Sequence, residues 1–214
     1  MPINQALSLK NASDNLRYDL SQIRIDKSIH ELVQMGKANR DKTPFEKLAK
    51  FKPVNRDVVQ GIQHVEHKLI SELLPLRHKR LAVSAFSFFR GTDELMAFDL
   101  SKQVSTNIPV VISGDAHIGN FGFYASPERK LLFDLNDFDE STIGSWDWDV
   151  RRLLVSILLA GEQLGIDANQ NKEIMRAAVE TYQQILCECF DDHSAMELSL
   201  IHIRRCRRRR ECRS

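Results

Sequence analysis

The sequence predicts an α+β fold that is rich in helices and carries a small β-hairpin. Three observations support this prediction. Apolar residues recur at the three- and four-residue steps of amphipathic helices in several segments. Short apolar runs bounded by turn residues lie between positions 108 and 135, which is typical of strands. The 214 residues are 43% hydrophobic and 28% charged, a composition that suits a globular core.

The first half of the chain is predicted to be mainly helical. Residues 1–52 are polar with some helical periodicity, and we expect a helical or extended segment there. Apolar spacing predicts a helix over Asp57–Leu74 that ends near Pro75, and DELMAFDLS predicts another over Asp93–Ser101. The dense aromatic run Leu81–Phe89 is predicted to be a strand or a buried loop.

The second half supplies the strands and two long helices. A strand is predicted over Ile108–Ile112, and a hairpin is predicted from Phe121–Tyr124 and Lys130–Leu135 around the turn at Ser126-Pro127. An acid, an apolar stripe and a terminal glycine predict a helix over Asp149–Gly165. A last helix is expected over residues 169–190.

The formal net charge of +1 conceals an unusual tail, because residues 198–214 hold seven Arg against one Glu. This segment could bind nucleic acid, but Leu198–Ile203 resembles translated sequencing-library adapter. We therefore expect residues 198–214 to be non-native and expect no nucleic-acid partner. The chain has neither a secretory leader nor an apolar run long enough to span a bilayer, which predicts a cytoplasmic protein without a membrane partner.

The loop Ser113–Asn120, SGDAHIGN, is the main candidate for chemistry. Gly114 and Gly119 have the spacing of a phosphate-binding P-loop, but Asn120 stands where that motif needs Lys. The acidic stretch after it, beginning at Asp134, starts like a calcium loop but lacks the glycine at position six. Neither motif is therefore predicted.

A joint site is the third interpretation of these two acidic stretches. A hairpin returns the chain, so Asn120 at its start and Asp137 beyond its end can lie side by side. An amide oxygen and a carboxylate are suitable ligands for Mg²⁺. Asp115 could then face an incoming hydroxyl as a base, as in kinase catalytic loops.

SGDAHIGN resembles the HGDxHxxN loop of aminoglycoside and choline phosphotransferases, and LNDFD at 135–139 resembles their metal-binding segment. More closely, residues 73–160 resemble the bacterial family known as domain of unknown function 2252, in LLPLRHKRLAVSAFSFFRG, MAFDL, SGDAHIGNFGFYASPERKLLFDLNDFDE and GSWDWDVRRLLVS. The resemblance implies a protein-kinase-like fold, with residues 53–197 as a partial domain. Members of that family are considerably longer, which implies that this chain is C-terminally truncated.

The resemblance also implies roles for individual residues. Asp115 would be the catalytic base and His117 would orient the loop. Asn120 and Asp137 would bind the Mg²⁺ that accompanies the nucleotide. Asp134 and Asp139 compete with Asp137 as the second ligand. Asp149 would brace the loop and cap its helix.

The chain departs from the kinase pattern because none of its nine glycines forms a G-x-G-x-x-G loop and no strand lysine is evident. The best substitute phosphate-binding cation is Arg90, with Arg77 and Arg80 nearby, although a salt bridge is an equal alternative for Arg90.

From the resemblance as a whole we expect a Mg²⁺-dependent phosphotransferase that uses ATP or another nucleoside triphosphate. Its acceptor is an unidentified small molecule or protein, and this fragment is expected to be inactive. The alternatives are a nucleotide-binding pseudokinase-type regulator and a metal-dependent phosphoester hydrolase.

Overall fold

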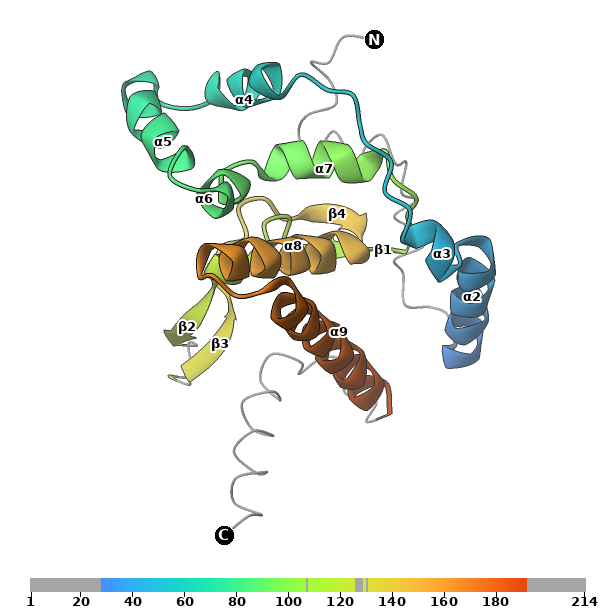
Figure 1. The fold of residues 1–214 in the computed structure, drawn as a ribbon. Coiled ribbons are helices and arrows are strands. Elements are labelled where there is room, and N and C mark those ends of the chain that lie inside the picture. Colours follow the sequence, from blue (N-terminus) through green and yellow to red (C-terminus); the bar gives the residue numbers. More distant parts are fainter. Residues whose placement is uncertain (1–27, 107, 126–128, 130, 192–214) are drawn as a thin grey trace. The chain divides into compact units, whose positions relative to one another are not determined.

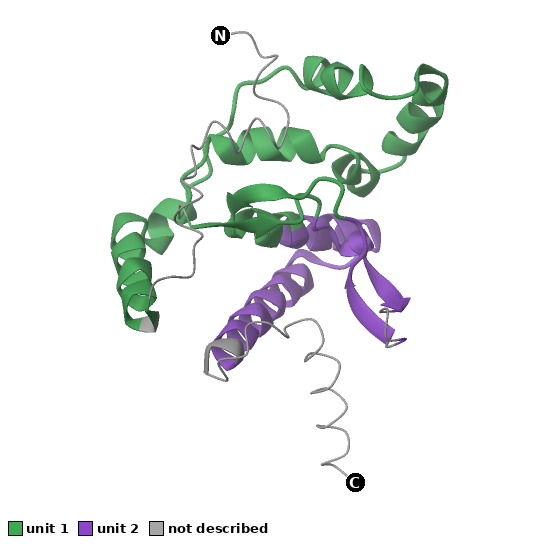
Figure 2. Ribbon diagram, turned by 180° about the vertical axis from the view of Figure 1, so that it is seen from behind, with its two compact units in different colours: residues 1–115, 138–152 green, residues 116–137, 153–214 purple. Residues whose placement is uncertain are grey.

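A computed structural model describes residues 28–106, 108–125, 129 and 131–191 of the chain. The chain divides into two compact units, residues 1–115 with 138–152 and residues 116–137 with 153–214 (Figure 2). The described residues are mostly helical and include two small, antiparallel, two-stranded sheets (Figure 1). This architecture confirms the helix-rich α+β prediction, while its kinase-like part stays a prediction.

The first unit begins with a series of short helices. In the order of the chain they are α2 (Ile29–Lys42), α3 (Phe45–Leu48), α4 (Val58–Glu66), the 3-10 helix η3 (Ser71–Leu73), α5 (Leu74–Leu81), α6 (Ala85–Arg90) and α7 (Asp93–Ser101). Helix α2 starts with a capping box, in which Ser28 accepts from the Glu31 amide and the Glu31 carboxylate accepts from the Ser28 amide. The polar N-terminal region therefore contains a helix with a defined start, as its periodicity predicts.

Two predictions in this region are wrong. The helix predicted over Asp57–Leu74 is interrupted after Glu66, and Pro75 lies in the first turn of α5 instead of ending a helix. Proline is favourable there because the amides of a first turn have no partner within the helix. The run predicted as strand or buried loop contains helix α6, which starts where the Ser84 hydroxyl accepts from the Ser87 amide.

The core of the first unit forms between α7, strand β1 and the start of α8. Strand β1 (Pro109–Ile112) pairs antiparallel with β4 (Thr142–Ser145), which the sequence analysis did not predict. The buried core residues are Ala97, Leu100, Ile112 and Trp148, with Met96 and Val110 packed against them. The predicted bounds of α7 are confirmed. The buried residues of this helix are Glu94, Leu95, Ala97 and Leu100.

The second unit holds the predicted hairpin, formed by β2 (Phe121–Ala125) and β3 (Leu131–Leu135). The two strands pair antiparallel, with Phe121 opposite Leu135 and Ala125 opposite Leu131. The Phe133 ring lies 4.9 Å from the Phe123 ring, measured between centroids. The first strand of the hairpin, β2, starts directly after the candidate loop Ser113–Asn120. The hairpin therefore fixes where that loop ends.

Two long helices complete the described chain, α8 (Asp147–Gln163) and α9 (Ala168–Asp191). Helix α8 starts two residues before its predicted beginning. It ends near Gly165, whose φ of 74° lies in the left-handed region that favours glycine. At Gly161 a Cβ would lie 1.9 Å from Oδ1 of the buried Asn171, so a glycine is required for the close approach of α9.

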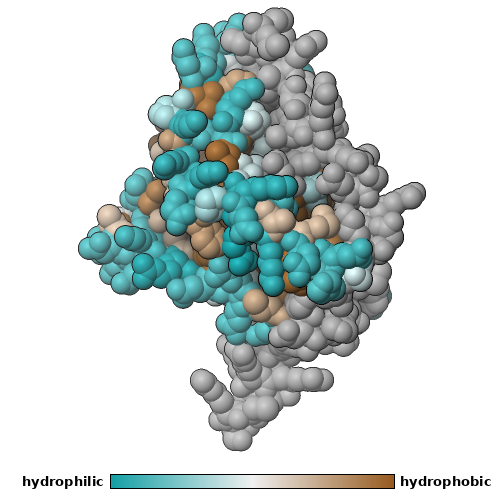
Figure 3. All heavy atoms as spheres, turned by 90° about the vertical axis from the view of Figure 1, so that its right-hand side faces the viewer, coloured by the Kyte–Doolittle hydropathy of each residue, from teal (hydrophilic) through white to brown (hydrophobic). Residues whose placement is uncertain are grey.

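The described surface is mixed in character. On the face drawn in Figure 3, hydrophilic residues cover most of the described area and hydrophobic residues appear between them in small groups. None of the described helices combines the length and the apolar character that a membrane crossing requires.

Candidate active-site loop

Helix α8 holds the start of the candidate loop through Asp149. Its carboxylate accepts a hydrogen bond of 2.7 Å from the Ser113 amide and one of 3.1 Å from the Gly114 amide. Burial raises the pKa of Asp149 above its ordinary value, and the two amide bonds oppose that rise because they stabilise the charged form. The bracing role expected for Asp149 is present, but the helix begins at Asp147, so Asp149 does not cap it.

The backbone at Gly114 admits only glycine. Its φ is 86°, and a Cβ built there would lie 2.3 Å from the carbonyl oxygen of Glu140. Side chains rarely adopt this conformation, and the obstructing atom belongs to the backbone. Gly114 thus allows the chain to turn out of β1 while its amide faces Asp149.

Asp115 follows in the same unit and contacts a buried arginine. The Asp115 Oδ1 accepts from the Arg152 Nε at 2.6 Å, and the Arg152 Nη2 lies 2.5 Å from the same oxygen. Arg152 is 2% exposed, so this ion pair is shielded on the arginine side. The carboxylate predicted to be a base is therefore held by a cation that the sequence analysis did not single out.

The second unit contains the rest of the loop. His117 is buried, and its carbonyl accepts from the Asn120 amide across the 3-10 helix η4 (Ile118–Asn120). The Ile118 amide donates to the Ser156 hydroxyl at 2.8 Å, and that hydroxyl donates to the Leu153 carbonyl. The orienting role expected for His117 stays a prediction, while Ser156 is a further α8 residue that holds the loop.

Asn120 and Asp137 lie side by side where the hairpin opens, as its topology predicts. The Asn120 Nδ2 donates to the backbone carbonyl of Asp137 at 3.3 Å, and the Asn136 amide donates to the Asn120 carbonyl at 2.9 Å. Asn120 is buried and Asp137 is exposed. Because Nδ2 faces Asp137, the Asn120 Oδ1 is turned away from that carbonyl.

The competing acids are placed differently. Asp134 lies on β3 and accepts from the adjacent Leu135 amide, while Asp139 is exposed in a turn of the first unit. Only Asp137, of these three, has a described contact with Asn120. Within the ranges that the structure describes, no three His, Cys, Asp or Glu side chains are gathered as a metal site. The described contact between Asn120 and Asp137 runs through the Asp137 backbone, so a Mg²⁺ site at these residues stays a prediction.

Arg90 ends helix α6 and its side chain is exposed. No salt bridge of Arg90 occurs among the described residues, and its contact with a phosphate stays a prediction. The Arg77 side chain already has a backbone partner, because its Nη2 donates to the Gly91 carbonyl at 2.7 Å. Arg90 therefore remains the candidate for contact with a phosphate.

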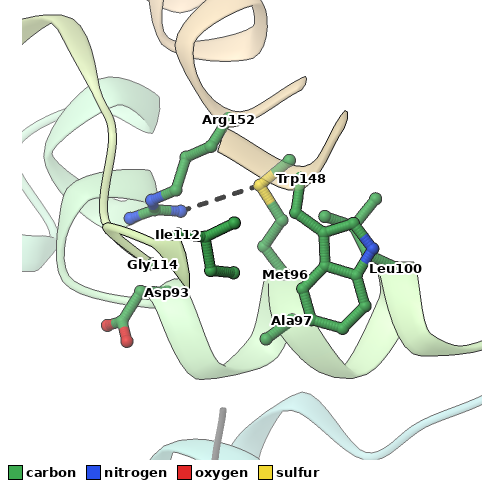
Figure 4. A pocket seen from close by; sticks show the side chains of 8 residues that line it. All are labelled: Asp93, Met96, Ala97, Leu100, Ile112, Gly114, Trp148 and Arg152. Atoms are coloured by element: carbon green, nitrogen blue, oxygen red, sulfur yellow. Dashed lines mark hydrogen bonds between the residues drawn. The ribbon is translucent and has the colours of Figure 1, made fainter. Parts of the chain in front are cut away.

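A small cavity lies beside Arg152 in the first unit (Figure 4). Its lining is mainly apolar and includes Met96, Leu100 and Trp148, with Asp93 and Arg152 as the charged members. Its volume of about 10 Å³ suffices for a single water molecule, so a nucleotide does not fit there. Burial raises the pKa of Asp93, and its Oδ2 is buried without a hydrogen-bond partner.

Sequence reasoning missed Arg152 and Ser156. A signal for Arg152 was present, because an arginine three residues after Asp149 falls on the same helix face as that bracing acid. A cation on a buried face requires an anion or carbonyl partner, but the sequence alone does not identify which.

One family model matches residues 69–210 of the chain, and its description is "Uncharacterized protein conserved in bacteria (DUF2252)". Comparisons with curated proteins and with solved structures find no significant match.

Proposed function

We propose that this chain, which belongs to the domain of unknown function 2252 family, derives from a phosphotransferase. The enzyme would move the terminal phosphoryl group of a nucleoside triphosphate to a hydroxyl or amine acceptor. The observation that carries the proposal is the contact between Asn120 and Asp137 at the open end of the hairpin. It brings the Asn120 side chain beside the backbone of Asp137, and an asparagine and an aspartate are the residue types that hold Mg²⁺ on nucleotide phosphates in kinases.

The other loop residues have roles that suit transfer. Asp115 would accept the proton of the acceptor as the acceptor oxygen or nitrogen bonds to phosphorus and the bond to the nucleoside diphosphate breaks. Arg90 would contact the phosphates, and His117 would orient the loop. A bound Mg²⁺ would neutralise charge on the transferred group. Asp149 supports the proposal because it fixes the backbone immediately before the base.

A nucleotide-binding protein without transfer activity is the second candidate. The ion pair between Asp115 and buried Arg152 favours it, because a carboxylate neutralised by a guanidinium is a weaker proton acceptor. Both candidates predict nucleotide binding, and they differ in turnover.

The test is a thermal-shift titration with ATP in the presence and absence of Mg²⁺, on this chain and on a longer member of the family. Saturating nucleotide at a hundred times Kd stabilises by about 2.7 kcal/mol, which raises Tm by about 5 to 10 °C. Asp137→Ala should remove the Mg²⁺-dependent part of the shift. Glu162→Ala, which removes an exposed acid from α8, should leave the shift unchanged.

Turnover then separates the two candidates. Asp115→Ala should keep the Mg²⁺-dependent shift and lower ATP consumption by about a hundredfold or more. Binding with no consumption by the unmodified proteins would favour the second candidate. Absence of any Mg²⁺-dependent shift in either protein would contradict both.

A further inference from the structure

Arg152 is a fully buried cation with a complete set of partners. Besides Asp115, its Nη2 donates to the Phe89 carbonyl at 3.1 Å and approaches the Arg90 carbonyl at 3.4 Å. The guanidinium carbon lies 4.4 Å from the centre of the Phe89 ring, and Nη1 lies 3.7 Å from the Met96 sulfur. A buried charge is tolerated only when it is paired in this way. The guanidinium therefore joins the end of α6 to the loop.

A comparison with the neighbouring Arg151 shows that the contacts of Arg152 depend on its position in α8. Arg151 is partly exposed and pairs with Asp147 one turn earlier, at 2.9 Å. It has the same side chain, one residue away on the same helix, but its partner lies on that helix. Only Arg152 reaches the loop and α6.

We propose that Arg152 is a positioning residue that fixes the carboxylate of Asp115 relative to the end of α6, where Arg90 lies. The inference rests on the proposed function for its catalytic consequence, because Asp115 is the expected base and Arg90 the expected phosphate contact. Both Arg152 contacts to Asp115 end on the same oxygen, Oδ1, which restricts rotation of the carboxylate. The Nη2 that contacts Asp115 also donates to the Phe89 backbone carbonyl, which has no side-chain rotamer to change.

Asp93 explains why the cation itself is needed. Burial raises the pKa of Asp93 most, the charge of Arg152 opposes that rise, and the charge of Asp115 adds to it. Removing the guanidinium would leave Asp93 and Asp115 to repel each other in a partly buried setting. A neutral substitution at 152 would therefore disturb more than the position of Asp115, and a cationic substitution is the cleaner test.

The experiment compares R152K with R151K, its matched control, in this chain. A single ammonium keeps the charge but lacks the planar fork that reaches Asp115 and the α6 carbonyls together. We expect amide hydrogen exchange at Ser113 and Gly114 to accelerate about tenfold in R152K and to stay unchanged in R151K. In an Asp115→Asn background, R152K should add little, because Arg152 acts through that carboxylate.

The kinetic arm uses MgATP consumption by a longer family member carrying the corresponding changes. We expect R152K to lower kcat about tenfold while KM for MgATP stays within about twofold. Equal exchange in R152K and R151K, or an undiminished R152K effect on exchange in the Asp115→Asn background, would overturn the proposal. So would a kcat that R152K leaves unchanged or increases. If the unmodified enzyme consumes no ATP, the proposed function fails, and the exchange results alone still decide the role of Arg152.

Discussion

The candidate residues of the first unit and those of the second unit are held by different means. In the first unit, Ser113, Gly114 and Asp115 are fixed by charged side chains of α8, with an acid on the backbone amides and an arginine on the carboxylate. In the second, Asn120 and Asp137 meet through a neutral contact between an amide and a carbonyl, and the Asp137 side chain is exposed. Charged, partly buried contacts are costly to break, whereas neutral contacts near solvent are not. Asp115, the proposed base, is thus held by an ion pair with a buried arginine, whereas the side chain of Asp137, a proposed metal ligand, is exposed to solvent.

Alanine substitutions at two glycines, one in each unit, test most directly whether the two units differ in rigidity. Gly114→Ala puts a Cβ against the Glu140 carbonyl at a positive φ, and we expect a loss of about 2 to 5 kcal/mol. Gly122→Ala puts its Cβ against the amide end of Asn136, an exposed side chain that can move, so the expected loss is about 1 kcal/mol. Urea unfolding of both variants measures the difference. Equal losses would contradict the expectation that the loop around Gly114 is held more rigidly than the hairpin around Gly122.

The charged contact of Asp149 can be removed on its own. Asp149→Ala leaves the Ser113 and Gly114 amides without their partner, and we expect a loss of about 2 to 4 kcal/mol in the free energy of unfolding. Asp149→Asn keeps one acceptor oxygen and should lose less. Urea unfolding is the measurement, and Glu162→Ala is the control on the same helix. Stability unchanged by Asp149→Ala would show that water replaces the carboxylate without cost.

The smallest expected effect concerns the buried acid beside Arg152. Burial raises the pKa of Asp93 in the folded state, so the folded protein binds its proton more tightly than the unfolded chain does. The free energy of unfolding should therefore fall as pH rises from the ordinary aspartate value near 4 through the raised pKa. Asp93→Asn cannot ionise and should flatten this slope above about pH 4. Part of the slope should remain, because burial also raises the pKa of Glu94 and Asp149.

Urea unfolding at several pH values measures that slope. Gln170→Ala, which removes an exposed side chain that cannot ionise, is the control and should give a curve parallel to that of the unmodified protein. If the Asp93→Asn curve is parallel as well, the ionisation of Asp93 does not oppose folding.

Local sequence signals predicted the elements that depend on local contacts. The bounds of α7 and the pairing of the hairpin follow from helix-dipole acids, apolar alternation and turn residues, all within a few positions. The contact between Asn120 and Asp137 could be predicted because a hairpin brings its ends together. Helix α6 was missed because its six residues are too few to show a helical period.

Non-local contacts account for the other misses. Strand β4, TIGS, has no alternating pattern, and it is a strand because β1 lies beside it more than thirty residues earlier in the chain. The role of Arg152 depends on carbonyls of α6 that are 62 and 63 positions away. No spacing within α8 could have revealed those partners.

The three α8 residues that hold the loop, Asp149, Arg152 and Ser156, are spaced by three and four positions. Each residue of an α-helix turns the chain by about 100°, so a single insertion or deletion between them would rotate one contact away from the loop. Helix α8 therefore carries a spacing rule, D-x2-R-x3-S, that is independent of the identities of the intervening residues. Sequences too divergent to align along their whole length can be compared at this pattern together with the upstream Gly-Asp pair.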